Sequence, residues 1–173
     1  MSSAKPAAGG ALPSLSFPKV GGGSLSVGGV RERWALFVVY RGKHCGRCKK
    51  YLTLLEGMKG DWETAGFDIV VVSADPQEKA QADITEFGWS FDIGYGLTEA
   101  QMQELGLYIS HPRSPEETDK PFSEPGMFAV NAEGKVHLID ISNTPFHRAD
   151  LNELLETVEW VKENDYPIRR TYE

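Results

Sequence analysis

The stretch "RWALFVVYRGKHCGRCKKYLTLLE", residues 33–56, contains a strand pattern, both cysteines of the chain and a helix pattern in direct succession. The apolar run at residues 34–40 is rich in valine and aromatic residues, which is typical of a buried central strand. From about Gly46 the apolar residues recur at helical spacing, at Tyr51, Leu54, Leu55 and Met58. A strand that leads straight into a helix predicts the start of an α/β fold, with Cys45 and Cys48 at the junction.

The segments around this stretch extend the same pattern. "FDIVVVSAD", residues 67–75, predicts a second buried strand, and helices are expected after Pro76 and after Thr98, where Gln101 completes a capping box. "GMFAVNAEGKVHLIDI", residues 126–141, predicts two strands joined by a turn, and a last helix follows within residues 147–165. "LSFPKVGGGSLSV", residues 15–27, predicts an N-terminal β-hairpin. The expected fold is a mixed central β-sheet flanked by helices.

The bulk composition suits one domain and limits the classes of partner. The chain has 173 residues and a formal net charge of −7. Nucleic acid is therefore not expected as a partner, because phosphate binding requires clustered lysine and arginine. No apolar run is long enough to cross a bilayer and the start lacks a signal-peptide core, so no membrane partner and a cytoplasmic location are expected. We expect a disordered leader at residues 1–13, a domain at 14–165 and an irregular tail at 166–173.

The spacing of the two cysteines favours thiol redox chemistry. Cys45 is expected at the N-terminus of the helix, where unpaired backbone N–H groups stabilise a thiolate and lower its pKa. Arg47, Lys49 and Lys50 act in the same direction. Cys48 lies one turn further on the same face, so a disulfide can close between the two sulfurs. Cys45 is then the expected nucleophile, and Cys48 the shielded thiol that resolves the mixed disulfide.

Two other interpretations of the pair are weaker. A structural zinc site needs four ligands, whereas the chain has one Cys-x-x-Cys and scattered histidines. Inert core cysteines are also possible, although the junction of a strand and a helix is a poor place for burial. We therefore expect neither a metal nor another cofactor. His44, next to the pair, either tunes Cys45 electrostatically or is simply exposed to solvent.

The segment "ALFVVYRGKHCGRCKKYLTLLE" resembles the redox-active segment of thioredoxin-like proteins, with Cys-Gly-Arg-Cys as its motif. "SEPGMFAVNAEGKVHLI" is similar to the segment that holds the cis-proline of that fold. The resemblance implies that Pro125 is this proline and that, with Glu124, His44 and Arg47, it borders the substrate. An extended peptide would then lie along the backbone edge at Pro125. Without the resemblance, Pro125 is a proline that opens an edge strand.

A broader similarity, over roughly residues 15–160, is to the peroxiredoxin-like redoxins of the alkyl hydroperoxide reductase and thiol-specific antioxidant group. In their Pro-x-x-x-Thr/Ser-x-x-Cys pattern, Cys48 takes the peroxidatic position, Cys45 replaces the hydroxyl residue and Arg41 replaces the proline. Pro125 stands where those proteins carry an arginine, for which Arg47 or Arg113 are candidate substitutes. The strand also lacks the buried aspartate that serves thioredoxins as a proton acceptor.

These residues lead to a ranked set of functions. The leading hypothesis is a thiol-disulfide oxidoreductase that acts on protein or small-molecule disulfides and is itself reduced again by an upstream thiol reductant. The second is a thiol peroxidase in which Cys48 attacks peroxide and Cys45 resolves. The third is a non-catalytic redox sensor or binding module, for which the proline-rich loop at residues 109–124 offers an interface.

Overall fold

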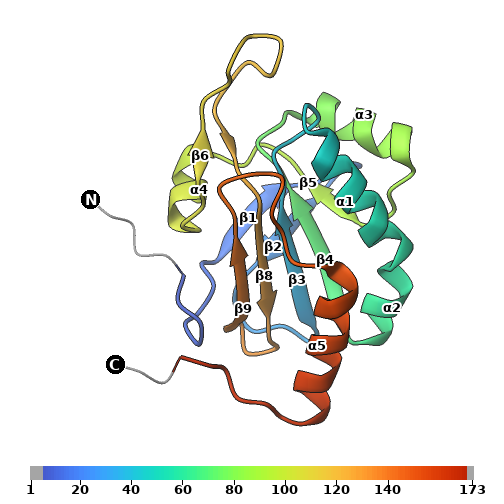
Figure 1. Ribbon diagram of the computed structural model, residues 1–173, viewed down its shortest axis with the longest axis vertical. Coiled ribbons are helices and arrows are strands. Elements are labelled where there is room, and N and C mark those ends of the chain that lie inside the picture. Colours follow the sequence, from blue (N-terminus) through green and yellow to red (C-terminus); the bar gives the residue numbers. More distant parts are fainter. Residues whose placement is uncertain (1–5, 171–173) are drawn as a thin grey trace.

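A mixed five-stranded sheet forms the centre of the computed structural model, which describes residues 6–170 (Figure 1). Its strands run in the order β5 (Asp92–Gly94), β4 (Phe67–Val72), β3 (Trp34–Val39), β8 (Gly126–Val130) and β9 (Val136–Ile141). The pairs β3–β4 and β4–β5 are parallel, whereas β3–β8 and β8–β9 are antiparallel. The expected mixed α/β sheet is confirmed, and β3, which leads to the cysteines, is its central strand.

Helices cover one face of this sheet (Figure 1). They are α1 (Gly46–Gly57), α2 (Lys59–Thr64), α3 (Gln77–Phe87) and α5 (Leu151–Glu163). Leu36 and Val38 of β3 share a buried cluster with Leu52 of α1 and Val158 of α5. Because alternate residues of a strand point to opposite faces, Phe37 faces a second buried cluster on the other side.

The hairpin of β1 (Leu15–Pro18) and β2 (Ser24–Val27), together with α4 (Glu99–Glu104), covers that second face. The predicted hairpin is therefore confirmed, as is the capping box: Thr98 accepts a hydrogen bond from the Gln101 N–H, and the Gln101 side chain accepts one from the Thr98 N–H. The segment expected as a loop at residues 109–124 differs at its ends, where β6 (Ile109–Ser110) and β7 (Phe122–Ser123) pair antiparallel.

The N-terminal segment does not behave as the expected disordered leader. Leu12 is buried, and its N–H donates to the Gly134 carbonyl at 3.0 Å. The Gly9 N–H donates to the Val136 carbonyl at 2.8 Å. The prediction is wrong for residues 6–13 because their backbone pairs beside β9, while residues 1–5 lie outside the described residues.

At the other end, residues 166–170 form neither helix nor strand, and the rest of the predicted tail, residues 171–173, lies outside the described residues. No helix within residues 6–170 has both the length and the hydropathy needed to cross a membrane.

Candidate active site

Cys45 is the N-cap residue of α1, as its position between strand and helix predicts. Its Sγ accepts a hydrogen bond from the Cys48 backbone N–H, with 3.2 Å between sulfur and nitrogen. A thiolate at this position fills the role that serine or aspartate oxygens have at other helix starts, because it satisfies a free N–H of the first turn. Both sulfurs are reduced, and both residues are buried.

The two cysteines have opposite pKa shifts. The pKa of Cys45 is lowered to about 6, chiefly by a hydrogen bond from the Cys48 side chain. The Cys48 N–H and the Arg41 side chain add to this effect, and burial opposes it. Burial raises the pKa of Cys48, and the hydrogen bond to Cys45 raises it further. At neutral pH the pair therefore holds one thiolate, on Cys45, and one thiol, on Cys48.

Arg41 is the cation that acts on Cys45, whose pKa it helps to lower. Its Nε lies 3.2 Å from Oε2 of the buried Glu124, and its Nη2 lies 3.7 Å from Oε1 of Glu117. The guanidinium also stacks over the ring of Phe122, 4.7 Å from its centroid. The segment at residues 109–124 thus holds Arg41 against the dithiol. This gives the proline-rich loop a positioning role that its sequence does not reveal.

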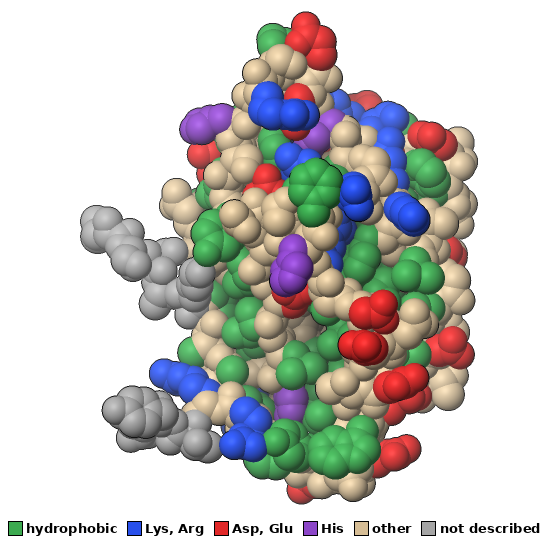
Figure 2. All heavy atoms as spheres, in the orientation of Figure 1, with side chains coloured by type: hydrophobic (Ala, Val, Ile, Leu, Met, Phe, Trp, Pro, Cys, Tyr) green, Lys and Arg blue, Asp and Glu red, His purple; other side chains and the backbone are tan. Residues whose placement is uncertain are grey.

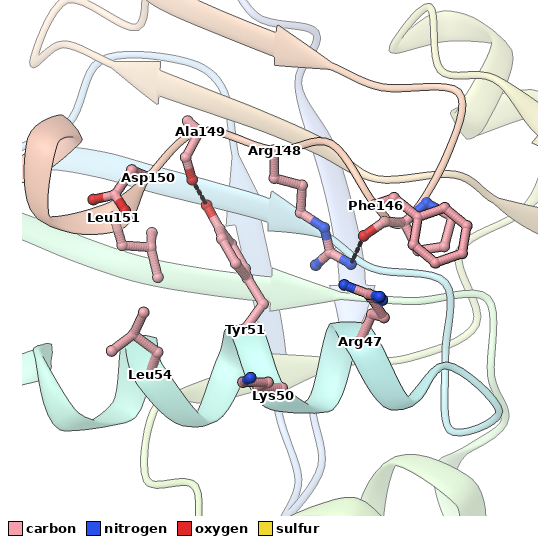
Figure 3. Close-up of a pocket in the computed structure, with 10 residues that line it drawn as sticks. Arg47, Lys50, Tyr51, Leu54, Phe146, Arg148, Ala149, Asp150 and Leu151 are labelled. Carbon is pink, nitrogen blue, oxygen red and sulfur yellow. Dashed lines mark hydrogen bonds between the residues drawn. The ribbon is translucent and has the colours of Figure 1, made fainter.

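Arg148 is a site residue that the sequence analysis missed. Its Nη2 donates to Cys48 Sγ at 3.1 Å and to the Pro145 carbonyl at 3.2 Å. Its guanidinium lies over the Tyr51 ring, and the Tyr51 hydroxyl donates to the Ala149 carbonyl (Figure 3). Arg148 precedes α5 and lies 100 positions from Cys48. No local pattern marks it, so only the tertiary structure identifies it.

The turn between β3 and α1 is fixed from the neighbouring strand. Asp75, just after β4, accepts a hydrogen bond from the Lys43 N–H at 2.6 Å. Gly42 has a φ of +120°, and a Cβ added there would lie 2.7 Å from the Asp75 carboxylate. The Cys45 N–H donates to the Gly42 carbonyl at 3.0 Å. Glycine is required at this position, and the buried carboxylate sets where the helix begins.

The structure places the other predicted residues around the pair with less direct contact. The ring of His44 packs against Phe122 with 4.5 Å between centroids, and its pKa is lowered by burial first and then by Arg41. His44 is therefore neutral at pH 7. Arg47 stacks on Phe146 at 4.7 Å, and Arg113 pairs with Glu117.

The expected geometry at Pro125 is wrong. No peptide bond within residues 6–170 is cis, so the bond before Pro125 is trans. The Pro125 carbonyl accepts a hydrogen bond from the Ser142 N–H, and the Glu124 N–H donates to the Tyr108 carbonyl. Both backbone groups are used within the fold, because the chain passes here from the β6–β7 hairpin into β8. The free edge expected for an extended peptide is not present at these groups.

The described part of the chain contains no group of three or more His, Cys, Asp or Glu side chains with the geometry of a metal site.

Comparison with known proteins assigns the family. The model of the AhpC/TSA family matches residues 8–139. The chain belongs to the AhpC/TSA family. An AhpC/TSA protein is a thiol-dependent redox enzyme, in agreement with the dithiol at the start of α1. Comparison with curated protein sequences finds no significant match.

Solved structures that resemble this AhpC/TSA protein are peroxiredoxin-like. A peroxiredoxin-like protein from Aquifex aeolicus superimposes with a TM-score of 0.78 at 16% identity, over 92% of this chain and 90% of that chain. A mutant of peroxiredoxin 6 of Arenicola marina superimposes with a TM-score of 0.76 at 14% identity, over 92% of this chain and 75% of that chain. Peroxidoxin BcpB from Mycobacterium tuberculosis superimposes with a TM-score of 0.72 at 12% identity, over 90% of this chain and 98% of that chain. The expected thioredoxin-like fold is thereby confirmed.

Proposed function

We propose that this AhpC/TSA-family enzyme reduces small hydroperoxides, with Cys45 as the attacking thiolate and Cys48 as the resolving thiol. The observation that carries the proposal is the capped Cys45 sulfur, whose pKa is lowered to about 6 and which is therefore ionised at neutral pH. The thiolate is the nucleophilic form of cysteine, so Cys45 is ready to react while Cys48 is held protonated.

The proposed reaction has two steps. The Cys45 thiolate attacks the distal oxygen of the hydroperoxide, the O–O bond breaks, and the alkoxide leaves as an alcohol after it takes a proton from solvent. Cys45 is now a sulfenic acid. Cys48 then attacks the Cys45 sulfur, the S–O bond breaks, and the hydroxyl leaves as water with the proton of the Cys48 thiol. The product is the Cys45–Cys48 disulfide, which a thiol reductant must reduce in every cycle.

Burial of the site favours a small substrate over a protein disulfide. Cys45 is 3% exposed and Cys48 is fully buried. The carbonyl of Pro125, where a peptide substrate was expected, is bonded to Ser142. Disulfide exchange requires a bulky sulfur to approach the thiolate in line, whereas a hydroperoxide presents two oxygens. The family model also favours peroxide reduction over the general disulfide exchange that the sequence analysis ranked first.

Arg41 supports the proposal through its charge, whereas the contact of Arg148 bears on the alternative. Arg41 stabilises the Cys45 thiolate, and donors of this kind can stabilise negative charge on the peroxide oxygens as the O–O bond breaks. Arg148 donates to Cys48, which favours the alternative in which Cys48 attacks peroxide and Cys45 resolves. The raised pKa of Cys48 opposes that alternative. No cofactor has a role in the proposed reaction, and the cytoplasmic location stays a prediction.

A single-turnover assay tests the proposal. Reduced wild type, Cys45→Ser and Cys48→Ser are each mixed with one equivalent of hydrogen peroxide, and peroxide loss and protein mass are followed. We expect Cys48→Ser to consume peroxide and form a sulfenic acid that dimedone labels, and Cys45→Ser to consume almost none. The reverse pattern would assign the attack to Cys48. Rapid reduction of insulin disulfides, with no peroxide consumption by any form, would restore the oxidoreductase hypothesis.

A further inference from the structure

A groove lies between α1 and the segment that joins β9 to α5 (Figure 3), and Arg148, which lines it, contacts the Cys48 sulfur. Its volume is about 550 Å³. Three cationic side chains line it, from Arg47, Lys50 and Arg148. Its apolar walls include Tyr51, Leu54 and Phe146, of which Phe146 is 71% exposed. A ligand that matches this surface combines negative charge with a short apolar part.

The charge of the groove contrasts with that of the molecule. The chain carries a net charge of −7, yet Lys and Arg side chains gather near the start of α1, while acidic side chains lie over α5 on the same face (Figure 2). The one carboxylate lining the groove, that of Asp150, already accepts hydrogen bonds from the Asn152 and Glu153 N–H groups at the start of α5. The positive charges of Arg47, Lys50 and Arg148 can therefore attract an anionic ligand.

Arg148 connects this groove to the reacting sulfurs. The same guanidinium that lines the groove donates to Cys48 Sγ and covers that sulfur. The Cys48 sulfur is neutral in the disulfide, as it is in the protonated thiol, so it is a poorer acceptor for a guanidinium than a carboxylate is. A carboxylate in the groove can then take the place of Cys48 as the partner of Arg148, which uncovers the sulfur in the oxidised enzyme.

The direction of disulfide reduction points to the same sulfur. A thiol that attacks a disulfide expels the sulfur with the lower pKa more readily. Attack on Cys48 expels Cys45, whose pKa is lowered to about 6, whereas attack on Cys45 expels Cys48, whose pKa is raised. Cys48, the sulfur that Arg148 contacts, is thus the better target for a reductant.

We propose that the groove is the reductant site, and that it binds a small thiol bearing carboxylate groups, which attacks Cys48 of the oxidised pair. This inference rests on the proposed function, because it assigns the step that regenerates the dithiol. The thiolate forms a bond to Cys48, the Cys45–Cys48 bond breaks, and Cys45 leaves as a thiolate. A second thiolate then attacks the bound thiol's sulfur and releases Cys48, which takes a proton, together with the oxidised small-molecule disulfide.

The test uses full-length protein oxidised with diamide, so that it does not depend on peroxide chemistry. Reduction rates are measured by acid quench, alkylation and mass spectrometry with 3-mercaptopropionate, neutral 2-mercaptoethanol and cationic cysteamine, each corrected for its thiolate fraction. We expect the anionic thiol to be about tenfold faster than the neutral one at low salt, and cysteamine to be slower, because steering of this kind changes association rates by roughly 10-fold or more. Salt at about 1 M should remove most of the difference.

A matched pair of variants locates the effect. Arg47→Gln/Lys50→Gln removes two charges from the groove, and Lys59→Gln/Lys135→Gln removes two charges elsewhere. Only the first should reduce the preference for the anionic thiol, to within about twofold of the neutral thiol. Equal rates for the three thiols in wild type, or an unchanged preference in the groove variant, would overturn the proposal.

Two further arms identify the thiol and the attacked sulfur. Reduction rates with glutathione and with its monoethyl ester are also compared. A faster rate with glutathione would identify a peptide thiol recognised through both carboxylates, whereas equal rates would indicate that any carboxylated thiol is accepted. Trypsin cleaves after Arg47 and so separates Cys45 from Cys48. The adduct trapped at short times is expected on Cys48, and an adduct on Cys45 would refute the assigned attack. If the disulfide is reduced as expected but peroxide is not consumed, the proposed peroxidase activity alone fails.

Discussion

Cys45 and Cys48 lie in one helical turn, yet their environments give them different chemical roles. Cys45 receives the free N–H of the helix start and the charge of Arg41, whereas Cys48 lies deeper and is fully buried. Hydrogen bonds from the Cys48 thiol first, and then from the Cys48 backbone N–H, therefore select Cys45 as the nucleophile. This division follows from where the helix begins, and it is independent of whether peroxide or a disulfide is the oxidant.

The pH dependence of alkylation checks the state of Cys45. Because its pKa is lowered to about 6, the thiolate is present above that pH and is lost as the pH falls through it. Iodoacetamide should modify Cys45 with a midpoint near pH 6, and Arg41→Gln should move the midpoint upward. Lys43→Gln, which removes a nearby charge that is not among the main causes of the Cys45 shift, is the control. A wild-type midpoint near the ordinary cysteine value of about 8.5 would contradict the helix-start argument.

Asp83 is a buried carboxylate that lowers the stability of the fold by an amount that depends on pH. It is fully buried, its oxygens have no hydrogen-bond partner within residues 6–170, and the nearest cation is Lys49 at 3.6 Å. Burial raises its pKa to about 6, so ionisation destabilises the fold increasingly as the pH rises from about 4 to 6. Asp83→Asn should therefore stabilise the protein above pH 7, by about 1 to 2 kcal/mol after loss of the Lys49 pair.

Urea unfolding of reduced wild type and Asp83→Asn at pH 4 and pH 7.5 measures this effect. The two forms should differ little at pH 4, where the wild-type carboxyl is protonated. Asp61→Asn, at an exposed position in α2, is the control for loss of one negative charge. A variant that is less stable than wild type at pH 7.5 would show that the Lys49 pair outweighs the burial.

Local sequence could reveal the cysteines but not their arginines. The strand–Cys–helix order fixes the place of Cys45 and Cys48, because each depends only on near neighbours. Arg41 becomes a site residue through Glu124, and Arg148 reaches Cys48 from 100 positions away. Those contacts depend on how residues 109–124 and the segment before α5 pack against the site. The hydrophobic periodicity of the sequence does not predict that packing.

The elements of the sheet were more predictable than their connections. Strands β3 and β4 are almost entirely buried, so their continuous apolar runs predict strands clearly. The ends of the helices are likewise marked by glycine and capping residues. The helix predicted after Gly46 instead ends at Gly57, and α2 begins at Lys59. The short pairing of β6 and β7 involves two residues on each side, too few to leave a pattern of alternation.

The turn before α1 gives a prediction at the scale of this element. Gly42→Ala would place a methyl group 2.7 Å from the Asp75 carboxylate at a φ of +120°. Strain of this kind costs about 1 to 3 kcal/mol, and the displaced helix start should also slow Cys45 alkylation. Gly57→Ala, where a Cβ meets nothing within 4 Å, is the matched control and should stabilise α1 by about 0.5 to 1 kcal/mol.

Thermal denaturation and alkylation rates of both alanine variants provide the measurement. Opposite changes in stability, with slower alkylation only in Gly42→Ala, are the expected result. An alkylation rate equal to that of wild type in Gly42→Ala would show that the turn does not set the position of Cys45.

At the scale of the whole molecule, the two ends of the sheet have different roles, one in chemistry and the other in stability. The carboxyl end of β3 presents the dithiol, and the opposite end, at the turn between β8 and β9, is joined to the N-terminal segment. Gly134 in that turn has a φ of +78°, and an added Cβ would lie 2.4 Å from the Gly29 carbonyl oxygen. Close approach of three segments there makes the N-terminal residues part of the domain.

Removal of residues 1–13 should therefore destabilise the protein without changing its chemistry. The truncation loses the buried Leu12 side chain, worth about 1.5 to 3 kcal/mol, and the backbone bonds of Gly9 and Leu12 to the β8–β9 region. A loss of about 3 kcal/mol lowers Tm by roughly 6 to 12 °C in a chain of this size. The midpoint of Cys45 alkylation should stay unchanged, because the truncated segment packs at the far end of the sheet. Removal of residues 1–5 alone is the matched control. If the protein that lacks residues 1–13 has the same Tm as the full-length chain, the packing of residues 6–13 contributes no stability. That result would support the disordered leader expected from the composition.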